Sequence, residues 1–235
     1  MLSAVRRHLP MPGRGGAGRS RVGLQWRGDH LALARLDPGA GPMPRIEQLQ
    51  WMQVEAARRG EAVRRLANTG VLRDAQIHLV LAPGEYDLYQ LPAPPVPDDE
   101  LREALRWQLR GTLPYAPEDA EIDFARIPAP VQDEVASTAK AAVLVVAAPR
   151  ATVEQLAAPF VAASVSVHAV DVPEFAQRNL ALLSPMSPNT RSGAQVPGCV
   201  AWITFDHDAC VLTVQTSAGH PQPGELCFTR RIHIP

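Results

Sequence analysis

The stretch that decides the fold is residues 77–119, which reads IHLVLAPGEYDLYQLPAPPVPDDELREALRWQLRGTLPYAPED. Its first apolar run, residues 77–81, predicts a buried strand, and residues 86–91 predict a second strand after a Pro-Gly turn. A proline-rich break then leads into a predicted helix over residues 98–110. Asp98 is its expected N-cap, because an aspartate at that position can accept a hydrogen bond from a free backbone N–H.

The predicted helix has a narrow apolar stripe and one aromatic residue away from it. Leucines and an alanine recur at helical spacing from Leu101 to Leu109, whereas Trp107 lies off the centre of that stripe. Two interpretations of Trp107 stay open. It packs under a neighbouring strand, or it is an aromatic anchor at a partner surface, where tryptophan is enriched.

The flanking sequence predicts alternating strands and helices. Strands are expected at 22–26, 31–36, 46–54, 141–148, 165–170, 200–205, 210–216 and 226–232, and helices at 55–68, 152–163 and 173–183. Pro159 is expected to kink or shorten the second of these helices. Asp171 is expected to cap the third, although a carboxylate at the end of a strand also permits a catalytic role.

These elements predict a divided chain. We expect a disordered basic tail over residues 1–21, a first domain over 22–183 with a subdomain inserted at about 84–140, a linker over 184–198, and the start of a second, truncated domain over 199–235.

Composition excludes several function classes. The 235-residue chain is 46% hydrophobic and has a formal net charge of -1, which argues against a nucleic-acid binder driven by overall charge. No apolar run approaches the roughly 20 residues that span a bilayer, and the N-terminus lacks the apolar centre of a signal peptide. Three cysteines without a CxxC pair fit a reducing compartment. The chain is therefore expected to be cytoplasmic.

One motif imitates a phosphate-binding loop. Residues 13–20, GRGGAGRS, match the spacing of a Walker A loop with arginine in the place of lysine. Such a loop joins a buried strand to a helix N-terminus, but a proline-rich stretch precedes this one and a predicted strand follows it. We therefore interpret it as part of the basic tail, which could rest near anionic lipid headgroups.

The order of elements resembles that of the cytoplasmic assembly proteins of type IV pili, the PilM type. Leu113-Pro114-Tyr115 and the acidic pair Glu118-Asp119 occupy the places of the turn and acidic residues that follow the corresponding helix in that family. Within the family the chain is most similar to the mannose-sensitive haemagglutinin (MSHA) pilus group. The resemblance implies an α/β, actin-like (ribonuclease-H-like) fold with an inserted α+β subdomain and an incomplete second half. It also implies a place at the inner face of the inner membrane of a Gram-negative bacterium.

Actin-like ATPases hold phosphates between two hairpins with an apolar-Asp-apolar-Gly pattern. The glycine lets the backbone approach the phosphate, and the aspartate positions hydrated Mg²⁺. In this chain Gln25 and Thr204 stand in the acid positions, and Arg27 and Asp206 in the glycine positions. We therefore expect degenerate phosphate hairpins, no ATP or Mg²⁺ cofactor, and no enzymatic activity.

Two alternatives concern the same turns. Asp29 or Asp208 could serve as the acid in another register, but neither is followed by the required glycine. His207 between two aspartates could be drawn as a metal site, but the ligand spacing of a zinc site is missing, so no metal is expected.

The resemblance implies a binding function. Family members hold the N-terminal cytoplasmic tail of a bitopic inner-membrane assembly protein and thereby contact the pilus motor ATPase complex indirectly. In this chain the groove wall is expected near the inserted subdomain, at Tyr86, Leu88, Tyr89, Leu101, Leu105, Trp107 and Tyr115. Two rival interpretations are an active actin-like ATPase and the actin-like cytoplasmic platform protein of type II secretion.

Overall fold

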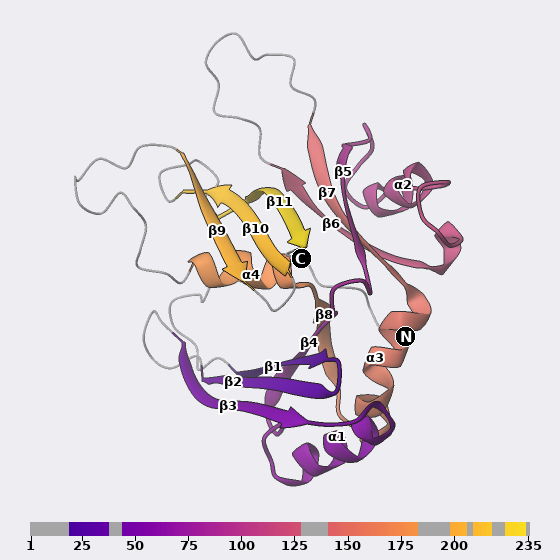
Figure 1. Ribbon diagram of the computed structural model, residues 1–235. Helices are drawn as coiled ribbons and strands as arrows, with labels where there is room; N and C mark the ends of the chain where they lie inside the picture. Colours follow the sequence, from indigo (N-terminus) through magenta and orange to yellow (C-terminus); the bar gives the residue numbers. More distant parts are fainter. Residues whose placement is uncertain are drawn as a thin grey trace, which may run out of the picture. The chain divides into compact units, whose positions relative to one another are not determined.

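The computed structural model describes residues 19–37, 44–127, 141–182, 198–205, 209–217 and 224–233. The chain forms two compact units that alternate along the sequence (Figure 1). Unit 1 comprises residues 1–87, 113–121 and 147–172, and unit 2 comprises residues 88–112, 122–146 and 173–235.

Unit 1 contains a five-stranded sheet in the order β3-β2-β1-β4-β8. Its strands are β1 (Ser20–Arg27), β2 (His30–Asp37), β3 (Arg45–Gln53), β4 (Ala75–Val80) and β8 (Val167–Asp171). The first three strands form an antiparallel meander, whereas β4 pairs in parallel with β1, and β8 in parallel with β4. The sequence pattern predicted each of these strands to within a few residues.

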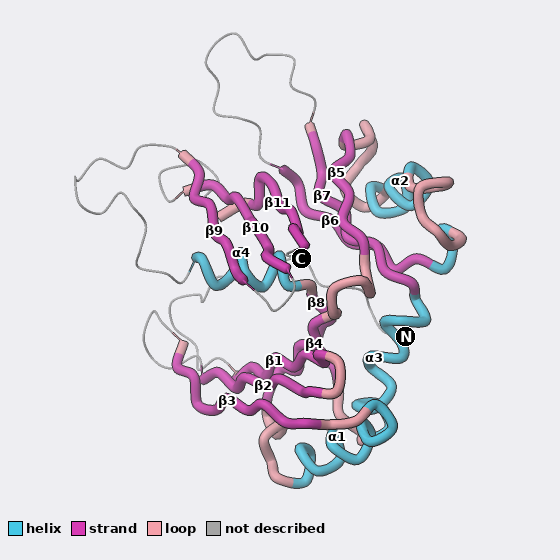
Figure 2. Tube along the Cα trace, viewed as in Figure 1, coloured by secondary structure: helices cyan, strands magenta, loops and turns pink. Residues whose placement is uncertain are grey.

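One face of this sheet is the core of unit 1. Alternate residues of β1, Val22, Leu24 and Trp26, are buried, as period-two alternation requires of a half-covered strand. The helical elements of unit 1 are the 3-10 turn η1 (Ala56–Arg58), α1 (Arg59–Asn68) and α3 (Arg150–Ala162), shown in Figure 2. Helix α3 packs against both α1 and β8.

Pro159 lies inside α3 and does not shorten it, so of the two predicted effects, a kink or a shortened helix, the second is wrong. The helix continues to Ala162, and the next residue, Phe160, is completely buried. A proline inside a helix removes one hydrogen bond. Burial of the Phe160 ring supplies an opposing stabilisation of about 2 kcal/mol, so the last turn remains helical.

The segment between β4 and α3 builds a second, smaller sheet. Its elements are β5 (Asp87–Pro92), α2 (Leu101–Gln108), the 3-10 turn η2 (Pro117–Asp119), β6 (Ala120–Ile127) and β7 (Ala142–Pro149). The strand order is β5-β7-β6, so β5 and β6 are the edges. The central strand β7 is buried from Val143 to Ala148, as its continuous apolar sequence predicted.

Helix α2 begins later than predicted, and Asp98 is not its N-cap. The helix starts at Leu101, and Glu100 occupies the N-cap position without a side-chain hydrogen bond. Residues before it form a turn in which the Glu100 N–H donates to the Pro97 carbonyl at 3.1 Å. The Asp98 carboxylate instead accepts a hydrogen bond from Arg126 on β6.

The last part of unit 2 is a helix followed by a three-stranded antiparallel sheet. Helix α4 (Pro173–Leu182) packs on β10 (Ala209–Thr216), which lies between β9 (Cys199–Phe205) and β11 (Leu226–His233). Before the helix, the Asp171 carboxylate accepts a hydrogen bond from the Val172 N–H at 2.8 Å. Within the described residues, none of the helices combines the length and apolar character needed to span a bilayer.

Candidate functional site

The first candidate site is the tip of the β1–β2 hairpin. Arg27 pairs with His30, and Gly28 and Asp29 form the turn between them. Gly28 has φ +59°, a left-handed conformation that glycine adopts without a steric cost. The sequence therefore closes the hairpin immediately after Arg27.

The hairpin tip is fastened to the end of β3. The Val54 N–H donates to the Asp29 carbonyl at 2.6 Å, and Gln53 Nε2 donates to Asp29 Oδ2 at 3.3 Å. His30 Nδ1 lies 2.7 Å from Asp29 Oδ1. The carboxylate of Asp29 therefore remains at the tip, held by its neighbours. It places negative charge there, which opposes the binding of an anion.

Two of the predicted hairpin residues also have defined positions. Gln25 Nε2 donates to the Leu81 carbonyl at 3.3 Å, so its amide is tied to the residue that follows β4. Arg27 is half-buried at the end of β1. A further cation, Arg59, donates to the Gly28 carbonyl at 3.2 Å and lies 4.8 Å from the centroid of the Trp26 ring. Sequence inspection did not single out Arg59, because its partners come from a separate strand.

The second hairpin is described only in part. Thr204 is exposed on β9 and pairs with Val211 on β10. Asp206, His207 and Asp208 lie outside the described residues, so their predicted roles stay predictions. Among the residues that are described, no group of three His, Cys, Asp or Glu side chains could hold a metal ion.

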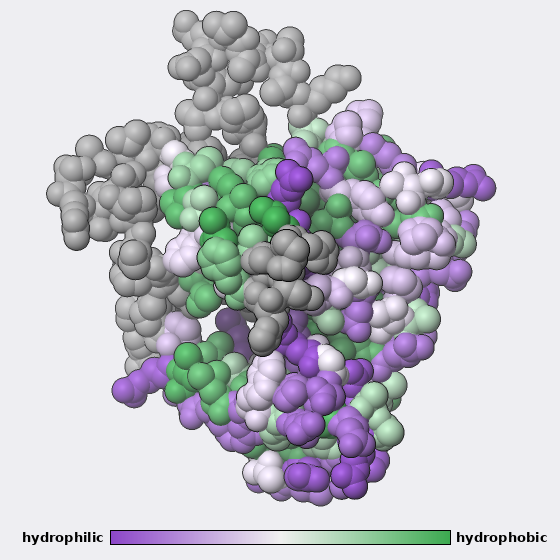
Figure 3. Space-filling model, viewed as in Figure 1, coloured by the Kyte–Doolittle hydropathy of each residue, from purple (hydrophilic) through white to green (hydrophobic). Residues whose placement is uncertain are grey.

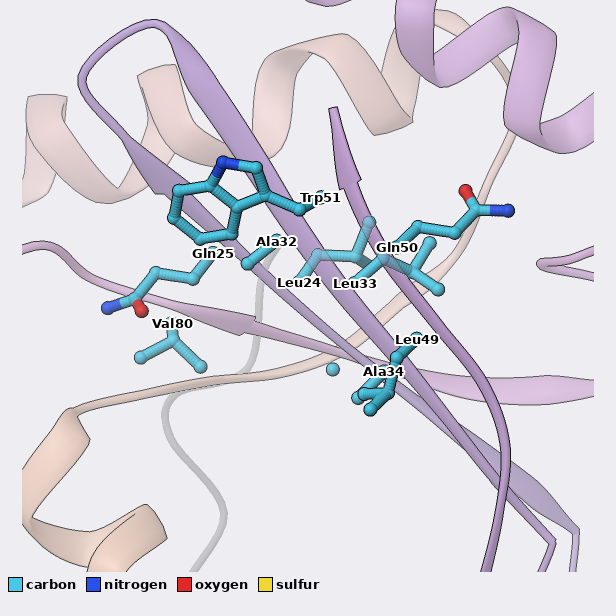
Figure 4. A pocket seen from close by; sticks show the side chains of 10 residues that line it. Leu24, Gln25, Ala32, Leu33, Ala34, Leu49, Gln50, Trp51 and Val80 are labelled. Carbon is cyan, nitrogen blue, oxygen red and sulfur yellow. The ribbon is translucent and has the colours of Figure 1, made fainter. Parts of the chain in front are cut away.

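The sheet face of unit 1 opposite the buried leucines carries a hollow of about 470 Å³. Small residues of neighbouring strands, Gly23, Ala32 and Ala34, form part of its lining. Leu49 and Trp51 on the edge strand β3 also line it (Figure 4). The Trp51 ring stacks on His30 with centroids 5.3 Å apart. The hollow is mostly apolar and was not predicted from the sequence.

Unit 1 also contains a pair of histidines on adjacent strands. The rings of His78 on β4 and His168 on β8 are tilted, with centroids 5.2 Å apart. Burial, the neighbouring His168 and the positive charge of Arg21 together lower the pKa of His78 to about 4. No local sequence pattern indicates this pair, because the two residues meet only through the β4–β8 pairing.

The second candidate site is the surface of the inserted subdomain. Leu101 and Leu105 on α2, and Leu109 directly after it, are completely buried and anchor the helix. Trp107 is 48% exposed, and the Arg110 guanidinium lies 5.4 Å from the centroid of its ring. The exposed ring excludes the interpretation that Trp107 packs under a strand, and it makes an apolar surface available beside a cation.

An ion pair fixes α2 to the sheet below it. Arg102 Nη2 donates to Asp123 Oδ1 at 3.0 Å, and Asp123 is buried on β6. A buried carboxylate requires a partner of this kind. This ion pair and the buried leucines therefore both hold α2 against the sheet.

The predicted partner-binding residues divide into two groups. Tyr86, Leu101 and Leu105 are buried, so in this structure their side chains belong to the core, and their part in partner binding stays a prediction. Their apolar character, which suggested a groove wall, is explained by packing. Trp107 is exposed, and the half-buried residues are Leu88, Tyr89 and Tyr115.

The half-buried residues lie partly on an edge strand. Leu88 and Tyr89 are on β5, which pairs with β7 at one side and is an edge of the β5-β7-β6 sheet. An edge strand presents backbone N–H and C=O groups that can pair with an added extended peptide. Tyr89 and Leu88 alternate in direction along that strand.

The sheet order of unit 1, three antiparallel strands followed by two parallel ones with an insertion before the second crossover helix, is that of the actin-like fold. A sequence-family profile described as type IV pilus assembly protein PilM matches residues 90–219, more than half of the chain. The chain belongs to this PilM family, as the sequence order of elements predicted. Among curated protein sequences, none matches the chain.

Solved structures confirm the predicted fold. A chain of the PilM-PilN type IV pilus biogenesis complex matches with a TM-score of 0.66 and 18% identity, over 90% of this chain and 61% of that one. The cytoplasmic domain of EpsL, an inner membrane component of the type II secretion system of Vibrio cholerae, matches with a TM-score of 0.53 and 14% identity, over 91% of this chain and 70% of that domain. The chain thus spans less than two thirds of the length of the PilM-PilN match.

Proposed function

We propose that this chain is a cytoplasmic scaffold of type IV pilus assembly that binds the N-terminal cytoplasmic tail of a bitopic inner-membrane protein. Membership of the PilM family supports the assignment to pilus assembly. The matched complex contains PilM together with PilN, and we extend that pairing to this chain as a proposal. Within the family we assign the chain to the MSHA group.

The observation that carries the binding proposal is the exposed Trp107 on a subdomain whose β5 strand is a sheet edge. An extended peptide that pairs with β5 would gain main-chain hydrogen bonds from that edge. Apolar side chains of the peptide would contact Leu88 on one face of the sheet or Tyr89 on the other, because successive residues of a strand point to opposite faces. A tryptophan beside an arginine offers both apolar area and a cation for a peptide carboxylate.

The same proposal includes loss of nucleotide hydrolysis. Gln25 is a weaker metal ligand than the carboxylate it replaces, because its amide oxygen carries no net negative charge to attract Mg²⁺. Arg27 has a long side chain where close backbone approach needs glycine. Asp29 adds a negative charge at the same tip. These three features support the proposal that the chain binds its partner without Mg·ATP.

A direct test measures binding of the tail peptide to the purified full chain by fluorescence anisotropy, in the absence of nucleotide. The peptide is the N-terminal cytoplasmic tail of a bitopic inner-membrane pilus assembly protein from the same genome. We expect saturable binding that Trp107→Ala weakens at least tenfold, because a buried aromatic anchor contributes about 2 kcal/mol or more. Trp51→Ala is the matched control, since it removes an exposed tryptophan from a sheet of unit 1. Absence of binding to the wild-type chain contradicts the proposal.

A second candidate function is that of a type II secretion platform protein. The observation in its support is the structural likeness to the EpsL cytoplasmic domain. The two functions differ in their partner. Selective binding of a tail from a secretion-system membrane protein, with none of a pilus protein, would favour the alternative.

A further inference from the structure

Two histidines that the proposed function does not use lie on neighbouring parallel strands of unit 1. His78 is on β4 and His168 is on β8, the strand beside it in Figure 1. Strand β8 has one extra residue at this point, since Ile77 pairs with Val167 whereas His78 pairs with Ala169. His168 is the residue left between these two pairs, and a bulge of this kind re-aims a side chain. At the bulge the ring centroids of the two histidines lie 5.2 Å apart.

The separation of the two rings matches that of two imidazoles bound to one metal ion. With Zn–N bonds of about 2.0–2.1 Å and a tetrahedral angle at the ion, the centroids of two bound imidazole rings lie roughly 5 Å apart. The centroids of His78 and His168 are 5.2 Å apart, and their ring planes are tilted by 59°. The spacing of the pair is therefore that of a two-histidine metal site.

His78 also has a ring nitrogen that needs a partner. Its Nε2 atom is buried and makes no hydrogen bond within the described part of the chain. A buried polar atom without a partner costs free energy, and coordination of a metal ion satisfies such a nitrogen. Burial, the neighbouring His168 and the charge of Arg21 lower the pKa of His78 to about 4. The ring is therefore neutral at pH 7, which is the form that binds metal ions.

The strand on the other side of β4 leaves room beside His78. In the pairing of β1 with β4, His78 lies opposite Gly23, which has no side chain. A Cβ placed on Gly23 would meet no atom within 4 Å. Such room matters here, because among the described residues no group of three His, Cys, Asp or Glu side chains could hold an ion. Water must therefore fill the remaining positions of a four-coordinate ion.

We infer that His78 and His168 together bind one Zn²⁺ or a similar divalent transition-metal ion, with water in its other positions. Imidazole nitrogen suits Zn²⁺, Ni²⁺ and Cu²⁺, whereas Mg²⁺ and Ca²⁺ prefer oxygen ligands. One histidine belongs to β4 and the other to β8, the last strand of the sheet. The ion therefore links β8 to β4, and it stabilises unit 1 because it binds the folded pair in preference to the separated strands.

A nearby arginine limits the affinity of this site. Arg21 on β1 is close enough to His78 for its positive charge to contribute to the lowered pKa of that ring. The same charge repels a bound cation. The affinity for Zn²⁺ is therefore weaker than two histidines alone would give, and it depends on a residue that is not itself a ligand.

Isothermal titration of zinc chloride into the metal-stripped full chain tests the site. We expect saturable binding that His78→Phe and His168→Gln each weaken at least tenfold, because each removes one of the two protein ligands. Excess Mg²⁺ should not compete. The chain has seven histidines, so the binding that belongs to the pair is the part lost in both variants. His30→Gln is the matched control and should leave this binding unchanged, since His30 Nδ1 is already 2.7 Å from Asp29 Oδ1.

Removal of the nearby positive charge gives the sharpest result. Arg21→Gln leaves both ligands in place and should tighten Zn²⁺ binding at least twofold. Zn²⁺ should also raise the urea midpoint of the wild type but not that of His168→Gln. Circular dichroism confirms that each variant is folded; should His78→Phe not fold, His168→Gln and Arg21→Gln still decide. Three outcomes overturn the proposal: no saturable Zn²⁺ binding, binding that neither histidine variant weakens, or binding that Arg21→Gln leaves unchanged.

Discussion

Arg231 Nη2 lies 2.8 Å from Oε1 of Glu174, whose side chain has no exposed surface. One residue belongs to β11 and the other to the first turn of α4. Glu174 also benefits from the positive end of the helix dipole. This ion pair joins α4 to the three-stranded sheet, and its carboxylate is completely buried.

Loss of this ion pair should destabilise the protein measurably. Glu174→Gln keeps the shape of the side chain but leaves the Arg231 charge without its carboxylate, at an expected cost of about 2 kcal/mol in the free energy of unfolding. Urea denaturation monitored by circular dichroism measures it. The control is Glu103→Gln, which breaks a pair with Arg106 in which the glutamate is largely exposed, and should cost no more than about 0.5 kcal/mol. Equal effects of the two substitutions would contradict the role given to burial.

The stability of unit 1 should fall in mild acid because of His78. Its pKa is about 4 in the folded chain and 6.5 in the unfolded chain, so the unfolded chain binds more protons between these values. The contribution of neutral His78 to the free energy of unfolding is therefore fully present above pH 6.5 and is lost as the pH falls toward 4. His78→Phe keeps a ring beside His168 but cannot be protonated. We expect the urea midpoint of this variant to change less between pH 7.5 and pH 5 than that of the wild type; an identical pH dependence would argue against His78 as the cause.

Two glycine-to-alanine substitutions at uncrowded positions should reveal the cost of backbone strain alone. A Cβ at Gly111 or at Gly23 meets no atom within 4 Å, but Gly111 has φ +80° whereas Gly23 lies in an ordinary strand conformation. Gly111→Ala should therefore lower the free energy of unfolding by about 1 kcal/mol through strain after α2. Gly23→Ala should be neutral or raise it by up to about 0.5 kcal/mol, since alanine restricts the unfolded chain. Thermal denaturation of both variants checks the sign of each effect.

Nucleotide binding provides a test of the first hairpin. We expect a fluorescent ATP analogue with Mg²⁺ to show no saturable binding to the wild-type chain, because Gln25, Arg27 and Asp29 oppose metal and phosphate there. Isothermal titration with Mg·ATP is the independent measurement. Micromolar affinity that disappears on Arg27→Glu would instead favour an active actin-like ATPase.

The strands of unit 1 could be predicted because their pattern is local. β1 alternates buried and half-buried residues along most of its length, and β7 is continuously apolar, so each pattern reports the number of faces that are covered. Pairing across the sheet followed from the order of elements in the family rather than from any single strand.

The errors came from contacts between residues far apart in sequence. Asp98 fits the pattern of a helix cap, but Arg126 on another strand captures its carboxylate. The apolar stripe of α2 has the same sequence signal whether it faces a partner or a core, and the structure buries Leu101 and Leu105. The exposure of Ile203 and Phe205 on β9 was also not predicted; Figure 3 shows hydrophobic side chains at the surface over the strand labelled β9 in Figure 1. Alternation shows that two faces differ, but it does not reveal which one receives the chain's own helix.

The parallel pairing of β4 with β8 has a consequence for synthesis on the ribosome. Val80 pairs with Asp171, so the fifth strand of the sheet reaches its place only after the whole intervening segment has been translated. The earlier strands and α1 can assemble as they emerge, because their pairings are local. Until β8 arrives, the free side of β4 is an open edge, and a nascent chain at that stage is the one most exposed to mispairing and to capture by chaperones.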